Sequence, residues 1–211
     1  LYSVVFMVDY ALVARAVLRA ERGKAHQAQF RYMKLKQQVN PHFLFNSLNI
    51  LDCLVCEQRT EQASVYIHKL AGIYRYMLQN EEETLVRLRE EMAFVGMYVD
   101  LLQVRFPEGF RVETDISDEA MNRHVLPCSV QLLIENAIKH NSVGADRPLV
   151  IRIVAVAEAV TVSNNLQLKV SGNPSTRVGL NYIRQQYLDL SGIPIGIRRT
   201  DTEYCVTLPL L

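Results

Sequence analysis

The feature that most constrains the fold of this chain is a pair of amphipathic helices joined by a very short turn. Pro41 favours a helix start, because the missing N–H of proline has no partner in the first turn, and Asn40 then lies at the N-cap position. This helix is predicted to end near Glu57, and a second is predicted to follow Thr60. Because such a hairpin buries little apolar surface alone, we expect two copies to pair in a four-helix bundle, which makes the chain a homodimer.

A helical wheel separates the first of these helices into an apolar and a polar face. The apolar arc contains Phe43, Leu44, Leu48, Ile50, Leu51, Leu54 and Val55, with Ser47 inside it. His42 and Asn46 lie on the opposite side, one helical turn apart. The wheel therefore excludes a buried core histidine. It leaves two interpretations, a capping or surface residue and an exposed, neutral imidazole that acts as a nucleophile.

Composition adds limits on the class of protein. The chain has 211 residues, of which 49% are hydrophobic and 21% charged, as in an ordinary globular protein. Its net charge of +1 gives no reason to expect nucleic acid as a partner. Four cysteines without an extracellular-style framework indicate a reducing compartment. Cys53 and Cys56 share one helix and lack a second pair at zinc spacing, which favours packing over metal or redox chemistry.

The pattern along the chain predicts three parts. Residues 1–38 read as a connecting helix whose apolar start is interrupted by charges and is too short for a membrane span. We expect a membrane or sensor segment upstream of this helix. Residues 39–83 hold the helical hairpin, and residues 84–211 mix helices with strands. Helices are predicted at Arg87–Phe106, Pro127–His140 and Thr176–Leu190, and strands at Phe110–Ile116, Leu149–Val156, Ala159–Val162, Ile193–Arg199 and Tyr204–Leu210.

The helix predicted from Pro127 carries a second group of polar residues. Its buried stripe is formed by Val130, Leu133, Ile134, Ala137 and Ile138. Asn136, Lys139 and His140 lie on the other face together with Glu135. A plain amphipathic helix explains this polarity. The residue types point further, because asparagine is a poor helix former but a hard-oxygen ligand suited to Mg²⁺ beside phosphates, and lysine supplies a point charge for phosphate oxygens.

At these residues the chain resembles the cytoplasmic part of LytS-type sensor histidine kinases. Residues 38–49 fit the family's phosphoacceptor motif QxNPHFLFNxLN, and Leu133–His140 fits its N-box. The segments Leu70–Tyr76 and Glu90–Phe106 are similar to the helices that link the two motifs. The resemblance extends from about Lys34 to Leu210.

The resemblance implies an α+β fold, in which an N-terminal helical hairpin (39–83) forms a dimeric four-helix bundle and a GHKL-type α/β sandwich (84–211) binds ATP. It implies that His42 accepts the γ-phosphoryl group of ATP and passes it to an aspartate in the receiver domain of a response regulator. Asn46 would orient the His42 imidazole or a water molecule, Asn136 would bind Mg²⁺, and Lys139 and His140 would lie near the nucleotide. The expected location is the cytoplasmic face of the bacterial inner membrane.

Two glycine-rich boxes depart from the family pattern. Asn164 occupies the position of the adenine-contacting aspartate, and Leu166 replaces the first glycine that follows. In the next box Arg177 replaces a glycine, whereas Gly179 and Leu180 are retained. Asn164, Arg177, Gly179 and Leu180 are nevertheless the expected nucleotide contacts. A degenerate member that acts as a dimeric scaffold with weak or no kinase activity is the alternative. An ATPase unrelated to phosphorelay is a third interpretation, which the intact motif at His42 argues against.

Overall fold

The computed structural model describes residues 41–169 and 178–211. The chain divides into two units, Leu1–Asn46 and Ser47–Leu211, which are described separately. In the first unit the described residues, 41–46, are helical and open helix α2 (Pro41–Cys56), so the predicted helix start at Pro41 is confirmed. The predicted connecting helix at 1–38 and the predicted nucleotide contact Arg177 lie outside the described residues.

In the second unit the rest of α2 leads through a tight turn into α3 (Thr60–Gln79). The turn is closed by backbone hydrogen bonds from Glu57 to Cys53 and from Arg59 to Leu54, each 2.9 Å long. The side chains of Ser47 and Tyr66 hydrogen bond across the two helices. The predicted hairpin is therefore confirmed, and its pairing with a second copy stays a prediction.

The apolar spacing on α3 predicts a buried stripe, and the observed buried face differs from it in part. The predicted stripe is Ile67, Leu70, Ile73, Tyr74, Met77 and Leu78. Leu70 and Ile73 are buried as predicted, but Ile67 and Leu78 are exposed in the single chain. Ala63 and Tyr66 are buried instead. The spacing of the four buried residues forms one continuous face, and the helix that covers this face, α4, comes from the following part of the chain. Apolar periodicity alone could not show which side α4 would cover.

Helix α4 (Leu88–Arg105) packs closely on α3. The rings of Tyr76 and Phe94 stack with their centroids 4.3 Å apart, and Lys69 forms an ion pair of 2.5 Å with Asp100. A Cβ atom added at Gly72 would lie 2.7 Å from the sulfur atom of Met97, so this position keeps the two helices close. The buried residues of α4 are Leu88, Glu91, Phe94, Val95, Tyr98, Val99, Leu101 and Leu102.

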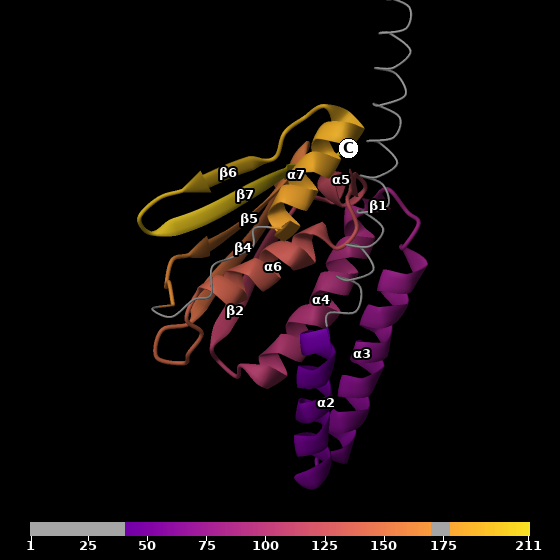
Figure 1. Cartoon of the computed structure of the whole chain (residues 1–211), viewed down its shortest axis with the longest axis vertical. Helices are drawn as coiled ribbons and strands as arrows, with labels where there is room; N and C mark the ends of the chain where they lie inside the picture. Colours follow the sequence, from indigo (N-terminus) through magenta and orange to yellow (C-terminus); the bar gives the residue numbers. More distant parts are fainter. Residues whose placement is uncertain (1–40, 170–177) are drawn as a thin grey trace, which may run out of the picture. The chain divides into compact units, whose positions relative to one another are not determined.

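A five-stranded mixed sheet forms the second layer of this unit, with the strand order β2-β4-β5-β7-β6. The strands are β2 (Phe110–Ile116), β4 (Leu149–Val156), β5 (Ala159–Asn165), β6 (Gly196–Arg199) and β7 (Glu203–Pro209). Strands β2 and β4 are parallel, and the other neighbours are antiparallel. Helices α6 (Ser129–His140) and α7 (Val178–Ser191) lie over one face of the sheet (Figure 1).

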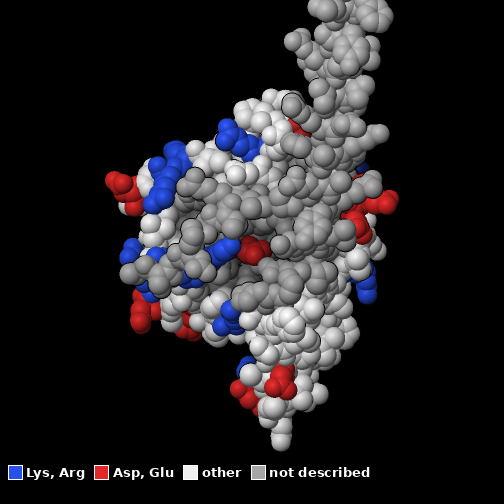
Figure 2. Space-filling model, in the orientation of Figure 1, with Lys and Arg blue, Asp and Glu red and all other residues white. Residues whose placement is uncertain are grey.

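Burial alternates along the strands as expected for a sheet with one covered face. In β4 the alternate residues Leu149, Ile151, Ile153 and Ala155 are fully buried. The opposite face carries an ion pair of 2.8 Å between Arg152 and Glu113 together with the exposed side chains of Val154 and Val156. On the side of the molecule where α6 and α7 lie, which Figure 2 shows, Lys and Arg side chains are interspersed with Asp and Glu side chains over the described residues. The predicted α+β fold, with an α/β sandwich after the helical hairpin, is confirmed.

Three short elements were not predicted, because two to four residues are too few to give a periodic signal. Strand β1 (Val86–Arg87) pairs with β3 (His124–Val125), and α5 (Asp118–Met121) begins after Ser117, whose hydroxyl accepts a hydrogen bond from Ala120. Helix α7 ends as predicted at Gly192, where a φ of +70° suits glycine. Across the described residues, no helix is long and apolar enough to cross a membrane.

Candidate active site

Helix α6 provides most of the predicted nucleotide contacts. All five residues of its predicted apolar stripe are buried, which fixes the rotation of the helix against the sheet. Asn136 and His140 are consequently half-buried, and Lys139 is exposed. Burial lowers the pKa of His140, and the positive charges of Lys139 and Lys169 lower it further, so this imidazole is neutral at pH 7. The polar face of α6 thus presents an amide, an ammonium group and a neutral imidazole.

Strand β5 brings Asn164 to the helix-covered side of the sheet. Asn164 follows Val160 and Val162 on the buried face of the strand, and it is only 5% exposed. Its amide nitrogen donates a hydrogen bond of 2.7 Å to the carbonyl of Asn165. The side-chain carbonyl is the remaining polar group at this position and is suited to accept from an amine. Because α6 contacts β5, Asn164 belongs to the same region as the polar residues of α6.

Helix α7 contributes the remaining described residues of the predicted site. Gly179 and Leu180 lie in its first turn and are half-buried. Helices α6 and α7 contact each other, and the approach of Gly179 and Leu180 to Asn136 stays a prediction. Tyr182, one turn into α7, is partly enclosed, and burial raises the pKa of its phenol.

Asn141, which sequence reasoning did not select, ties the end of α6 to the segment after β5. Asn141 is 2% exposed. Its amide nitrogen donates to the carbonyl of Ala137 at 2.8 Å, and its amide oxygen accepts from the backbone N–H of Gln167 at 2.8 Å. Lys169 donates to the carbonyls of Ile138 and Lys139 at 3.1 Å each, where the negative end of the helix dipole favours a cation. These contacts fix the start of the segment that leads to residues 170–177.

We expect Asn141→Ala to lower the free energy of unfolding by about 1–3 kcal/mol, because it removes the buried Asn141 amide that pairs with the Gln167 N–H and with the last turn of α6. Chemical denaturation measures this change, and hydrogen exchange at Gln167 should accelerate with it. Asn181→Ala, at an exposed position on α7, is the matched control. Equal stability of the two variants would contradict this assignment.

Glu91 is a second residue that sequence reasoning missed. It lies on the buried face of α4 and is 0% exposed. Its carboxylate accepts hydrogen bonds from the Tyr76 hydroxyl (2.8 Å) and from the backbone N–H groups of Cys128 (2.8 Å) and Val130 (3.0 Å). Burial raises the pKa of Glu91 to about 7, although each of these hydrogen bonds acts in the opposite direction.

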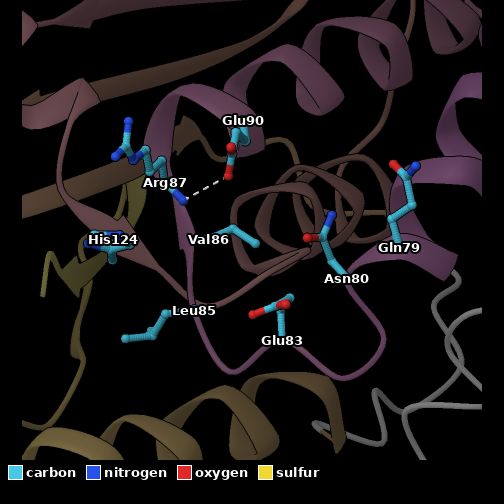
Figure 3. Close-up of a pocket in the computed structure, with 8 residues that line it drawn as sticks. All are labelled: Gln79, Asn80, Glu83, Leu85, Val86, Arg87, Glu90 and His124. Carbon is cyan, nitrogen blue, oxygen red and sulfur yellow. Dashed lines mark hydrogen bonds between the residues drawn. The ribbon is translucent and has the colours of Figure 1, made fainter.

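A polar cavity of about 320 Å³ lies at the junction between α3 and α4 (Figure 3). Its lining residues are Gln79, Asn80, Glu83, Leu85, Val86, Arg87, Glu90 and His124. The Glu90 carboxylate accepts a hydrogen bond of 3.2 Å from the backbone of Arg87 and so caps the start of α4. A second cavity, of about 260 Å³, has Arg152, Ser163 and one predicted nucleotide contact, Asn164, among its lining residues. The predicted contacts on α6 line neither of these two cavities.

The predicted phosphoacceptor His42 and its neighbour Asn46 belong to the backbone of α2 in the first unit. A helix places these two residues one turn apart on the same side, as the wheel predicts. Among the described residues, no group of three or more histidine, cysteine, aspartate or glutamate side chains could hold a metal ion. The metal ligand predicted on this chain is an amide, Asn136, which is half-buried on α6 and therefore reachable from solvent. An amide oxygen suits Mg²⁺ when phosphates and water supply the other ligands.

Comparison with known proteins identifies relatives of the chain. The family model described as "Histidine kinase" matches residues 30–110. The sensor protein LytS of Bacillus cereus is 39% identical over 106 residues, which are 50% of this chain and 18% of that protein. The sensor protein LytS of Staphylococcus haemolyticus is 28% identical over 190 residues, which are 82% of this chain and 32% of that protein. The chain thus spans between about a fifth and a third of the length of these relatives.

Solved structures that align with this chain include the catalytic domain of histidine kinase ThkA, at 15% identity and a TM-score of 0.41, covering 60% of this chain and 96% of that one. A bacterial phosphotransferase structure aligns at 13% identity with a TM-score of 0.46, covering 84% of this chain and 94% of that one. The sequence relatives and the family match agree in one respect: the chain is similar to LytS-type sensor histidine kinases.

Proposed function

We propose that this chain is the kinase portion of a two-component sensor, which uses ATP to phosphorylate His42 and then passes the phosphoryl group to an aspartate of a response regulator receiver domain. The observation that carries the proposal is the complete phosphoacceptor motif on α2, which opens at Pro41 within the region that matches the histidine kinase family. In this proposal residues 1–38 connect to a sensor, 39–83 form the phosphotransfer hairpin and 84–211 bind ATP at the cytoplasmic face of the membrane.

The proposed reaction is an in-line displacement at the γ-phosphorus of ATP. A nitrogen of the His42 imidazole forms the N–P bond while the bond to the departing ADP oxygen breaks, and the imidazolium releases its proton to solvent. Asn46, one turn further along α2, would orient the imidazole. Such a transfer needs positioning and charge neutralisation more than covalent help from the protein.

The nucleotide would be held by the polar face of α6 and by the neighbouring ends of β5 and α7. Asn136 would ligate Mg²⁺ through its amide oxygen, and Lys139 would contact phosphate oxygens. The neutral His140 can accept or donate one hydrogen bond near them, and the Asn164 carbonyl can accept from the adenine amine. The backbone N–H groups of Gly179 and Leu180, in the first turn of α7, would approach the phosphates. Arg177 would supply a further positive charge for the phosphates. When bound, Mg²⁺ neutralises charge on the transferring phosphoryl group.

A homodimer is the proposed assembly. Leu48 and Val55 on α2 and Val65 and Ile67 on α3 are apolar yet 46–60% exposed in the single chain. These side chains lie on the hairpin that the family uses for phosphotransfer, and their burial in a four-helix bundle would stabilise a pair of chains.

A dimeric scaffold with weak or no kinase activity is the second candidate. The observation that favours it is the pair of altered boxes, in which an uncharged Asn164 replaces an aspartate and Leu166 and Arg177 replace glycines. Side chains at glycine positions restrict how closely backbone N–H groups can approach phosphates.

Incubation with γ-labelled ATP and Mg²⁺ separates the two candidates. The kinase proposal predicts label on the protein that is lost in acid and retained in alkali, as expected for a phosphoramidate. Subsequent addition of a receiver domain should move the label to an aspartate. Absence of label together with absence of nucleotide binding would contradict the kinase proposal and support the scaffold.

A further inference from the structure

Helix α6 lacks an N-cap of its own. The residue at the N-cap position, Cys128, adopts a left-handed φ of 60°, and its side chain makes no capping hydrogen bond. The first N–H groups of a helix have no partner within the helix and need an acceptor from elsewhere. Glu91 of α4 supplies it, with Oε2 accepting from Cys128 at 2.8 Å and Oε1 from Val130 at 3.0 Å and Gln131 at 3.5 Å. The cap of α6 therefore comes from another helix.

The same carboxylate is shared with α3. Oε2 of Glu91, which accepts from Cys128, also accepts from the Tyr76 hydroxyl at 2.8 Å. Tyr76 lies near the end of α3, and its ring is fixed by stacking on Phe94 at an interplanar angle of 11°. One buried carboxylate thus joins the second helix of the proposed phosphotransfer hairpin to the helix that carries Asn136.

We propose that Glu91 is a positioning residue that couples α3 to α6, so that a displacement of Tyr76 changes how firmly the start of α6 is held. Because Asn136 lies about 9 Å along the axis from Val130, at 1.5 Å per residue, it moves with this end of the helix. In its reference to nucleotide binding, this inference rests on the proposed function. The coupling itself concerns only the contacts among α3, α4 and α6.

The ionisation of Glu91 makes the coupling measurable. The titratable groups that face this carboxylate are Tyr76 from α3, Cys128 before α6 and Tyr187 from α7, while Glu90 of α4 acts on Tyr76. Burial raises the pKa of Glu91 to about 7, and the hydrogen bonds from Tyr76, Cys128 and Val130 lower it. Because the hydrogen bonds favour the ionised form, ionisation of Glu91 strengthens the cap of α6 while Glu91 stays buried. Below pH 7 one oxygen of the carboxyl group carries a proton and accepts hydrogen bonds less well than the same oxygen of the carboxylate.

Global unfolding responds to pH in the opposite direction. In the unfolded chain the carboxyl group is in water with its ordinary pKa of 4.5, so the folded protein binds the proton more tightly. The contribution of Glu91 to stability is therefore fully present below pH 4.5 and is lost as pH rises through about 7. Protection of the first turn of α6 should rise over the same interval in which this contribution to stability falls. If Glu91 only supported the fold, the protection of this turn and the global stability would change with pH in the same direction.

The test compares Tyr76→Phe with Tyr74→Phe in the full chain. Both changes remove one hydroxyl from α3, but the Tyr74 hydroxyl is buried without a hydrogen-bond partner, so Tyr74→Phe is a matched control. Hydrogen exchange of the first turn of α6, corrected for the intrinsic rate, is measured from about pH 6 to pH 8.5, around the Glu91 pKa of about 7. In the wild-type chain protection should rise with pH through one transition. We expect the midpoint pH of this transition to be higher in Tyr76→Phe and unchanged in Tyr74→Phe, and we expect the transition itself to be absent in Glu91→Gln.

Nucleotide affinity is the second readout, measured with a fluorescent ATP analogue and Mg²⁺ at pH 7. We expect Tyr76→Phe to weaken affinity by about three- to tenfold, within the range for the loss of one typical hydrogen bond, while Tyr74→Phe stays at the wild-type value. If the wild-type chain bound no nucleotide, the proposed function would fail, and the exchange midpoints would still decide the coupling. Identical midpoints in Tyr76→Phe and Tyr74→Phe, or a pH dependence that survives in Glu91→Gln, would overturn it.

Discussion

Replacement of His42 by glutamine is expected to reduce the incorporation of label from γ-labelled ATP to background while leaving nucleotide affinity within about twofold of the wild-type value. Glutamine keeps a polar side chain on the helix but has no nitrogen lone pair that can attack phosphorus, so only the chemical step is removed. Label on the protein is measured after gel separation under alkaline conditions, and affinity is measured separately with an ATP analogue.

His68→Gln is the matched control for this experiment. His68 lies exposed on α3, and its ring nitrogen Nδ1 is 2.7 Å from the carbonyl of Ser64. It is thus a second histidine on the same hairpin, and its loss should leave labelling unchanged. Asn46→Ala should reduce transfer by about tenfold or more if the amide orients the imidazole, since small misplacement of a reacting group is costly. Undiminished labelling of His42→Gln would assign the phosphoryl group to another residue.

The parts of the fold that follow a single period could be predicted from the sequence. The stripe of Val130, Leu133, Ile134, Ala137 and Ile138 repeats at helical spacing, and all five side chains are buried in the structure. Strands β2 and β4 have the predicted limits, because their alternation is uninterrupted and turn residues flank them. The glycine that stops α7 could be predicted for the same local reason, since Gly192 adopts a positive φ.

The parts that depend on long-range partners could not be predicted. A glutamate beside Glu90 at the start of a helix is typical of a solvated first turn, yet Glu91 is fully buried. Its partners come from α3 and from the start of α6, far away in the sequence, so no local pattern marks it. Asn141 is similar, because an asparagine at the end of a helix indicates a C-cap, but its bond to Gln167 depends on the return of the chain after β5.

The candidate site was predictable in its residue types and less so in its surroundings. The motifs selected Asn136, Lys139 and His140, and the structure adds that α6 contacts both β5 and α7, which carry Asn164 and Gly179. The neutral state of His140 has a cause that the sequence shows only in part. Lys139 is its neighbour along the chain, but Lys169 comes to the end of α6 from the segment after β5.

The sharpest test of the nucleotide proposal is Asn136→Ala, which should weaken the binding of an ATP analogue in the presence of Mg²⁺ by about 100-fold, because it removes the only proposed protein ligand of the metal ion. Alanine favours a helix interior more than asparagine does, by about 0.5 kcal/mol, and Asn136 is half-buried on the polar face of α6. The variant should therefore be at least as stable as the wild-type chain in chemical denaturation.

This opposition between stability and binding is what makes the result interpretable, because a weakened site cannot then be attributed to a damaged fold. Asn136→Asp keeps an oxygen ligand of the same size and should retain more of the Mg²⁺-dependent affinity than alanine does. Asn122→Ala is a matched control, since Asn122 is exposed and lies outside α6, where its amide donates to the carbonyl of Asp118 at 3.0 Å and accepts from Arg89 at 3.4 Å. Equal affinity of Asn136→Ala and Asn122→Ala would exclude α6 as the metal-binding helix, and the scaffold would then be the better account of the chain.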